Sequence, residues 1–439
     1  MLFRSGVQLG KSSLFGSYSY QESDGWIPVR APQRGAADSP VTLMARSISA
    51  RFETVPFTGT VLAVRGGLYD EHRNAGIVGS QSRTQGASGS ITLAHPESQG
   101  ELGWRLQTWF RNTDLANVTY AVQGGLARSS TLPSNNQYAT PAIGYGFNAA
   151  LRGQNFNIDW EAGADARFNQ GETRELYQVV SGAYTRSRLA GGRNYTGGIY
   201  AEGASRFDGW LITAGARLDN WSSSNGHLTQ RTISTGALLN DTDYAPKSGV
   251  LPTGRLGIRK DWEGGFYSRM AGYEGFRVPS LNELYRPFRL GNNFTLANPA
   301  LTPEKLYGAE VGGGFEMDGF SLDAALFWNR LDDAITNVTT GVGPQTIDLG
   351  FVPAGGLIIQ RQNAGVIDAF GVEGDASWRA SDTLSFNAAF ALTSASVNGG
   401  TAAPQLTGKR PAQTPRWTIT AGAVTTPVRW LTQIGRAHV

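Results

Sequence analysis

The chain has 439 residues, of which 57 are glycine and none is cysteine. The lack of cysteine excludes a disulfide scaffold and a cysteine-based metal site. The net charge of +3 comes from mixed signs, without the basic block that nucleic-acid binding needs. No run of about 18 apolar residues predicts a membrane-spanning helix, so a membrane interpretation has to rest on strands.

Several segments alternate strictly between apolar and polar side chains. In residues 102–106, the first of them, Leu102, Trp104 and Leu106 are apolar. From Phe156 to Phe168 every even position is apolar, and the odd positions carry four charges. The alternation recurs in chain order over residues 210–218, 320–328, 372–378 and 384–390. A period of two predicts strands with one apolar face and one polar face.

The connections between these strands fall into two classes. Short connections are predicted at Gly153–Gln154, Asp208–Gly209, Asp318–Gly319 and Ser381–Asp382, where Asp-Gly is the strongest hairpin signal. Long loops are predicted at residues 23–42, 113–139, 221–249, 278–305, 333–356 and 397–414. A soluble β-protein would also alternate, but short turns at one rim, long loops at the other and aromatic residues near strand ends favour an outer-membrane barrel.

We therefore predict an all-β chain that forms an antiparallel, up-and-down transmembrane β-barrel. The patterns indicate about sixteen strands plus a C-terminal stub. The residues predicted to face lipid are Ile158, Trp160, Ala162, Ile212, Ala214, Leu322 and Leu326. The residues predicted to face inward are Asp159, Glu161, Asp165, Arg217 and Asp323. A register slip of one residue would exchange the two faces.

Residues 275–287, GFRVPSLNELYRP, interrupt the alternation abruptly. Pro279 has no backbone N–H to donate, so strand pairing is expected to stop there. The Leu-Asn-Glu-Leu-Tyr run that follows can form a short turn of helix. Downstream, Pro299 and Pro303 are expected to hold the chain extended as it returns to the next strand.

These two proline-containing segments resemble motifs of the TonB-dependent outer-membrane receptor family. In that family an aromatic-Arg-x-Pro-[Ser/Thr]-x-x-Glu-Leu segment leaves a barrel strand, and an Asn-Pro-x-Leu-x-Pro-Glu segment enters the next one. Weaker similarities occur over residues 363–373 and 406–416, and the resemblance covers about residues 250–430. The matching residues are Phe276, Arg277, Pro279, Glu283, Leu284, Asn298, Pro299, Leu301, Pro303 and Glu304.

The resemblance implies a 22-stranded barrel plugged by an N-terminal domain, with a TonB-binding segment before the plug. Neither the plug nor that segment is recognised in the sequence. Residues 1–433 are therefore expected to be an incomplete portion of such a barrel, with strand-like sequence from about Ser13. Residues 434–439, IGRAHV, resemble a translated sequencing adapter, so we expect them to be foreign to the fold.

The function implied by the resemblance is active transport of a scarce ligand, such as a ferric siderophore or cobalamin, energised through TonB. The implied location is the cell outer membrane, and the implied partners are its lipid, the TonB complex and a small chelate or cofactor ligand. A passive porin or a structural barrel is the alternative. No enzyme activity, metal site or cofactor is predicted, because the four histidines lie far apart and no nucleophile–base arrangement is evident.

Four residues of the long loop at 278–305 are candidates for ligand contact: Tyr285, Arg286, Phe288 and Arg289. A guanidinium can hold a carboxylate bidentately, which suits anionic chelates. Aromatic faces suit ligands with apolar rings. The simpler interpretation is that the same side chains stabilise the loop itself.

Overall fold

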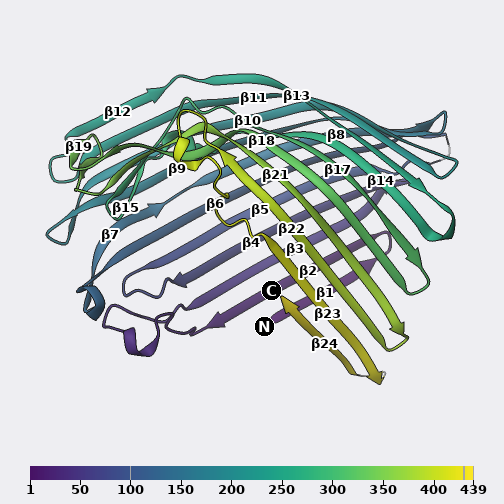
Figure 1. Cartoon of the computed structure of the whole chain (residues 1–439), viewed down its shortest axis with the longest axis horizontal. Coiled ribbons are helices and arrows are strands. Elements are labelled where there is room, and N and C mark those ends of the chain that lie inside the picture. The colour runs from purple at the N-terminus through teal and green to yellow at the C-terminus, as the bar shows by residue number, and fades with distance from the viewer. Residues whose placement is uncertain (99, 429–430, 439) are drawn as a thin grey trace.

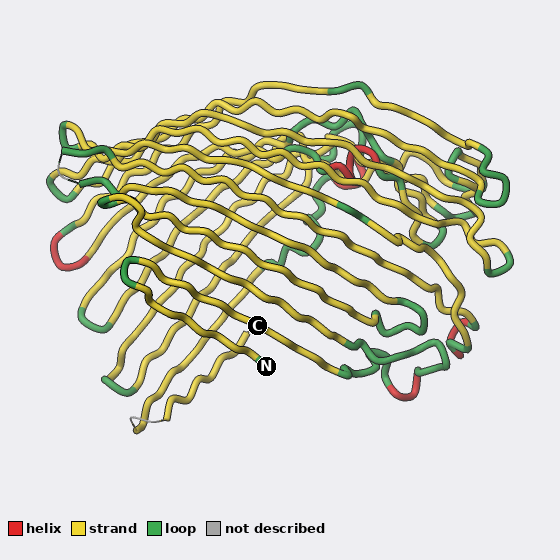
Figure 2. The backbone as a smooth tube through the Cα atoms, turned by 180° about the vertical axis from the view of Figure 1, so that it is seen from behind, coloured by secondary structure: helices red, strands yellow, loops and turns green. Residues whose placement is uncertain are grey.

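The computed structural model describes residues 1–98, 100–428 and 431–438. Long strands curve around to form an open barrel, with turns and loops gathered at its two ends (Figures 1 and 2). Within these ranges no helix has the length and apolar character needed to cross a membrane. The helical segments are α1 (Leu281–Tyr285) and the 3-10 turns η1 (Ala31–Gln33), η2 (Gly125–Ala127), η3 (Glu263–Gly265) and η4 (Pro404–Leu406).

The strands account for most of the chain and follow one another with few interruptions. In the first half they are β1 (Leu2–Leu9), β2 (Ser12–Ser23), β3 (Leu43–Phe57), β4 (Thr60–Asn74), β5 (Gln81–His95), β6 (Gly103–Gln123), β7 (Ser130–Ala139), β8 (Ala142–Asn155), β9 (Ile158–Val180), β10 (Ala183–Phe207) and β11 (Trp210–Thr232). In the second half they are β12 (Leu238–Tyr244), β13 (Lys247–Asp261), β14 (Phe266–Arg277), β15 (Phe288–Leu290), β16 (Asn293–Leu296), β17 (Glu304–Met317), β18 (Phe320–Val342), β19 (Gln345–Ile347), β20 (Gly350–Val352), β21 (Leu357–Ser381), β22 (Leu384–Asn398), β23 (Trp417–Val428) and β24 (Leu431–His438).

Twenty-two of these strands belong to one sheet, and β19 and β20 form a separate pair. Four of the 22 strands belong to the long loops at the outer end of the barrel: β7, β12, β15 and β16. The other 18 strands of the described chain form the wall. The predicted number of about sixteen strands plus a C-terminal stub was slightly low. One reason is that β1 begins at Leu2, well before the predicted start at Ser13.

The hairpin at the end of β8 lies three residues beyond its predicted place. Gly153 and Gln154 belong to β8, and the turn is made by Phe156 and Asn157, which have φ of 50° and 62°. Phe156 therefore leaves the apolar face on which the sequence pattern had placed it. The turn at Asp208–Gly209 is confirmed, with φ of 45° and 72°. The next hairpin signal, Ser381–Asp382, is off by one residue because β21 includes Ser381.

Three predicted loops are largely strand. Segments 113–139, 221–249 and 333–356 contain the outer parts of β6, β11 and β18, together with β7, β12 and the β19–β20 pair. Their polar sequences lack alternation because both faces lie beyond the apolar band, yet their backbones still pair. One short pairing, β16 with β21, is parallel, whereas the sheet had been predicted to be antiparallel throughout.

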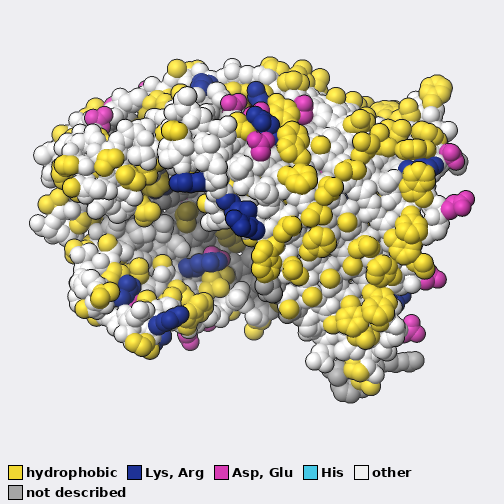
Figure 3. All heavy atoms as spheres, in the orientation of Figure 1, with side chains coloured by type: hydrophobic (Ala, Val, Ile, Leu, Met, Phe, Trp, Pro, Cys, Tyr) yellow, Lys and Arg dark blue, Asp and Glu magenta, His cyan; other side chains and the backbone are white. Residues whose placement is uncertain are grey.

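Adjacent residues of the wall strands face opposite sides, as predicted. Leu322 and Leu326 are 42% and 46% exposed on the apolar face. Asp323, between them in sequence, accepts hydrogen bonds from Tyr267 and Arg269 on the other face. Apolar side chains cover much of the barrel surface seen in Figure 3, beside a hollow that contains basic side chains.

The C-terminal segment is part of the sheet. Residues 434–438 belong to β24, which pairs with β23. This pairing does not test the origin of the segment, so the adapter interpretation stays a prediction. Val439 lies outside the described residues.

Candidate functional site

The short helix α1 begins where the sequence predicted a break. Ser280 is its N-cap, and its hydroxyl accepts a hydrogen bond from the backbone N–H of Glu283. The Glu283 carboxylate in turn accepts from the Ser280 backbone N–H at 2.8 Å, which completes a capping box. The buried Pro279 precedes the cap and offers its carbonyl to the side chain of Asn194 at 3.0 Å. The helix is thus tied to the inner face of β10.

The charged residues of the two family motifs meet around Arg277. This guanidinium donates to both oxygens of Glu283, at 2.9 and 3.1 Å, and also to Glu304, its direct partner across β14 and β17. The buried Glu304 also accepts from the backbone N–H of Ile335 at 2.6 Å. Burial alone would raise the pKa of Glu283, but hydrogen bonds from Arg277 and Ser280 outweigh it and hold that pKa below its ordinary value.

The apolar residues of the motifs form a small core under the loop. Leu284, Tyr285 and Leu301 are 1%, 2% and 1% exposed and pack together. The Tyr285 ring lies close to the backbone of β11, since a Cβ added to Gly226 would sit 2.3 Å from it. The ring also lies against Gly192 of β10, where an added Cβ would be 2.7 Å from it, and it stacks on Tyr244 of β12. Docking of α1 therefore depends on a wall residue that has no side chain.

The returning segment is held by amide side chains. Asn298 donates from its backbone to the carbonyl of Glu283 and from its side chain to the carbonyl of Arg361. Asn363, in one of the weaker sequence similarities, accepts from the backbone of Thr302 and donates to the carbonyls of Thr302 and Asp333. Three motif residues remain: Phe276, Pro299 and Pro303. Their side chains carry no hydrogen-bonding group, so they make no side-chain hydrogen bond.

A buried ionic cluster fixes the middle of the loop. Glu175 of β9, whose side chain is 1% exposed, contacts both Arg188 and Arg286. Arg286 also donates to Gln137 at 3.2 Å, and Arg188 donates to the carbonyl of Pro287. The loop from β14 thus reaches β7, β9 and β10, while its β16 pairs with β21. A connection that spans so many strands has to cross the concave side of the sheet.

The four predicted ligand residues divide into two pairs. Tyr285 and Arg286 are turned into the wall contacts described above. Phe288 is half-buried, with the guanidinium of Arg361 over its ring at 5.2 Å. Arg289 is exposed, donates to the carbonyl of Gly291 and lies 4.9 Å from the centre of the Phe294 ring. Their role in ligand contact stays a prediction: Tyr285 is buried, the Arg286 side chain is 17% exposed, Phe288 is half-buried and Arg289 is exposed.

Below the loop, the inner face carries further ion pairs. Arg217 donates to Asp219, which is 1% exposed, and to Asp165 on β9. Arg269 contacts Asp323 at 2.7 Å and Glu310 at 3.4 Å. The sequence predicted that these charges face inward but not which of them pair, because pairing depends on strand register. The inner wall is therefore polar and largely ion-paired along these strands.

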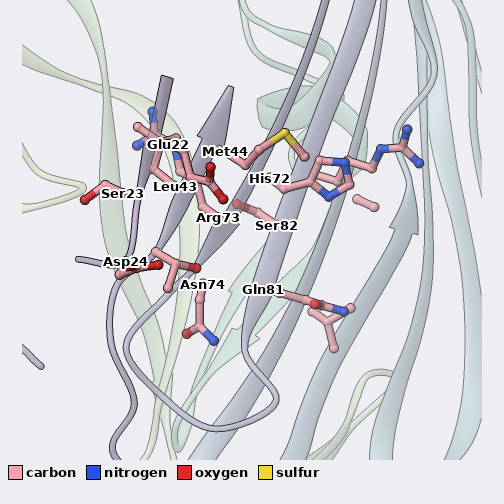
Figure 4. A pocket seen from close by; sticks show the side chains of 14 residues that line it. Glu22, Ser23, Asp24, Leu43, Met44, His72, Arg73, Asn74, Gln81 and Ser82 are labelled. Atoms are coloured by element: carbon pink, nitrogen blue, oxygen red, sulfur yellow. The ribbon is translucent and has the colours of Figure 1, made fainter. Parts of the chain in front are cut away.

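A separate hollow at the outer ends of β2 to β5 is shown in Figure 4. Met44 and His72 line it, and they lie on the same face as the exposed Ile48 and Leu68. The hollow thus opens on the lipid side of the barrel, above the apolar band, and not into the lumen. Among residues 1–98, 100–428 and 431–438, no three His, Asp or Glu side chains gather as a metal-binding group.

Comparisons with known proteins agree with this architecture. A family model described as "TonB dependent receptor-like, beta-barrel" matches residues 37–437. No curated protein matches the sequence.

Three solved structures show the fold similarity. The copper transporter OprC is 16% identical with a TM-score of 0.73, the ferric yersiniabactin uptake receptor FyuA from Yersinia pestis is 14% identical with 0.72, and the ferric-catecholate import receptor Fiu from E. coli K12 is 13% identical with 0.70. The matches cover 97%, 100% and 100% of this chain, and 64%, 65% and 69% of the respective structures. The chain thus spans about two thirds of their length, and at these identities the likeness concerns the fold.

Proposed function

Because the chain belongs to the TonB-dependent receptor family of outer-membrane β-barrels, we propose that the protein imports a scarce ligand across the outer membrane. The observation that carries this proposal is the family match over residues 37–437. The ligand class we propose is a ferric siderophore, cobalamin or a similar small chelate, and the energy source is the TonB complex. The names of the similar structures, which include copper and ferric-chelate transporters, support this class.

The arrangement of the loop at 278–303 is consistent with ligand entry from the outer end. It crosses the concave side and leaves Phe288 and Arg289 accessible above the buried cluster around Glu175. We propose that Phe288 and Arg289 contribute to ligand contact, whereas Tyr285 and Arg286 hold the loop. Arginine suits an anionic chelate because its planar group donates two parallel hydrogen bonds.

The test is uptake by cells that express the full-length gene that encodes this chain. Accumulation of a radiolabelled ferric siderophore is compared in a strain with TonB and in one without it. Energised import predicts accumulation that requires both the gene and TonB. A passive porin, the alternative, predicts uptake that persists without TonB and extends to unrelated small solutes, and that outcome would reject the proposal.

A test of the loop uses Phe288→Ala and Arg289→Ala against Asp318→Ala, in the turn region between β17 and β18 at the opposite rim. Weaker ligand binding in both loop variants, with unchanged binding in the control and equal surface expression, supports ligand contact. Wild-type affinity in both loop variants would remove Phe288 and Arg289 from the binding site.

A further inference from the structure

The lipid-facing side of β2 to β5 changes character beyond the apolar band. Direct cross-strand partners form rows on this face, two residues apart along each strand. The last apolar row is Tyr18, Ile48 and Leu68, which are 38%, 53% and 59% exposed. The next row toward the long loops is Tyr20, Arg46, Asp70 and Gln85. The row after it is Glu22, Met44, His72 and Arg83. Two arginines therefore lie directly beyond the surface that faces the lipid tails.

Asp70 holds the two arginines in place. Arg46 donates from Nη2 to one of its carboxylate oxygens at 2.8 Å, and Arg83 donates from Nε to the other at 3.0 Å. Nε2 of His72 lies 3.3 Å from the same carboxylate. The Asp70 side chain is 12% exposed, whereas those of Arg46 and Arg83 are 56% and 47% exposed. The carboxylate therefore orients both guanidiniums but neutralises only one of their two charges.

Both guanidiniums keep donors for a further partner. Each uses a single nitrogen for Asp70, and in the described part of the chain neither makes another hydrogen bond to the protein. A guanidinium carries five N–H donors in a planar fork. The remaining N–H groups of Arg46 and Arg83 can therefore hold an oxyanion bidentately.

The hollow in Figure 4 lies beside this cluster. It has a volume of about 490 Å³, and His72 and Arg83 line it together with the apolar side chain of Met44. The carboxylates that line it, Glu22 and Asp24, lie at its β2 side, two strands away from His72. The hollow is therefore cationic at its β4–β5 side, where it adjoins the apolar band.

Two other strands place an arginine just beyond a lipid-facing aromatic residue. Arg193 of β10 lies two residues beyond Tyr195, whose ring packs 4.8 Å from that of Phe168. Arg330 of β18 lies two residues beyond Trp328, which is 41% exposed on the apolar face. Aromatic girdles mark the membrane interface of a barrel. The arginines of β3 and β5 stand in the same relation to the last apolar row, which places them at the level of the lipid headgroups.

We propose that Arg46 and Arg83 bind a phosphate group in the headgroup of an outer-leaflet lipid, whose acyl chains lie along the last apolar row. The long loops mark the extracellular side of a barrel, so this rim lies in the outer leaflet. Anionic headgroups attract arginines near the membrane surface, and paired N–H donors match phosphate oxygens. The inference goes beyond the proposed transport and does not depend on which ligand is imported.

Native mass spectrometry of the chain, released from a neutral detergent, tests the site. The probes are lipid A, the same lipid after enzymatic removal of its phosphates, and inorganic phosphate. We expect saturable binding of lipid A, weaker binding of the dephosphorylated lipid, and no displacement of lipid A by an excess of inorganic phosphate. Binding should depend on the two guanidiniums, because they supply the donors to the phosphate.

The variants are Arg46→Gln, Arg83→Gln and the two combined. Each single change should raise the Kd for lipid A roughly fivefold, and the double change roughly 30-fold. The single variants leave Asp70 one arginine partner, so they carry the test if the double variant does not fold. Arg379→Gln is the matched control and should bind as the wild type does, because Arg379 is exposed on the inner face, next to the lipid-facing Trp378.

Three results would overturn the site. The first is equal binding of lipid A and its dephosphorylated form, or a Kd that does not change in the Arg46 and Arg83 variants. The second is displacement of lipid A by inorganic phosphate, which would indicate a site for soluble anions. The third is an equal loss of binding in Arg379→Gln, which would indicate a response to total charge alone.

Discussion

Replacing Glu175 by alanine should weaken the docking of the loop at 278–303 on the inner wall and raise the population in which the loop is undocked. This carboxylate is 1% exposed and is the shared partner of Arg188 and Arg286, whose side chains are 5% and 17% exposed. Removing one partner of a buried ion pair costs about 3–5 kcal/mol, because the remaining charges stay buried without compensation. Undocking of the loop relieves that cost by returning Arg286 to water.

The magnitude can be compared with the other contacts that hold the loop. Burial of Leu284 and Leu301 contributes about 1.5–3 kcal/mol each, so the loop should remain docked most of the time. A loss of about 3–5 kcal/mol raises the open population roughly 10²- to 10³-fold or more, since about 1.4 kcal/mol corresponds to a factor of ten. The wall strands should be unaffected.

Hydrogen exchange measured by mass spectrometry on the purified chain reports this opening. Peptides that cover α1 should exchange about 10²- to 10³-fold faster in Glu175→Ala than in the wild type. Arg289→Ala is the control, because Arg289 donates only within its own hairpin. If α1 exchanges within about threefold of the wild-type rate while the strands stay protected, the cluster does not hold the loop.

Three further predictions concern the same loop. Ser280→Ala removes the capping box and should cost about 1 kcal/mol, seen as roughly fivefold faster exchange in α1; an unchanged rate would show that the cap is dispensable. Gly226→Ala should push Tyr285 off β11 and expose α1 to protease. Gly275→Ala is the control and should not, because a Cβ added at Gly275 meets open space. Equal cleavage of both variants would contradict the contact between Tyr285 and Gly226. Because the pKa of Glu283 is lowered on folding, its contribution to stability is present above its ordinary pKa of about 4.3 and is lost as pH falls below it. Protease sensitivity of α1 should therefore rise below about pH 4 in the wild type but stay flat in Glu283→Gln, and a parallel rise in both would refute this role.

The sequence was sufficient for the fold class and the faces of the strands, because alternation is a local signal. Leu322 and Asp323 needed only their neighbours to be placed on opposite faces. The positions of the turns could be predicted less accurately. Phe156 looks like a strand residue by its apolar character, and nothing local signals that Phe156 and Asn157 adopt positive φ. The outer strand extensions were missed because their sequences alternate weakly.

The candidate site was only partly predictable. Both motif segments were identified, and the charged motif residues do converge on Arg277. The partner of Arg286 was not foreseeable, since Glu175 lies 111 residues away and only the loop path brings them together. Likewise, Arg46 faces Asp70 only because the hairpin between β3 and β4 sets that register. Such contacts follow from long-range pairing, for which a single sequence carries no local signal.

Site-directed spin labelling along β3 tests whether the wall has one lipid face and one lumen face. The chain contains no cysteine, so each position can be labelled singly. Labels at Ile48 and Phe52, exposed on the apolar face, should be relaxed by oxygen, which concentrates in lipid. Labels at Ser49 and Arg51 should be relaxed by a water-soluble nickel chelate. We predict that both accessibilities oscillate with a period of two and in opposite phase along residues 46–53. Oscillation in the reverse phase, or none, would contradict it.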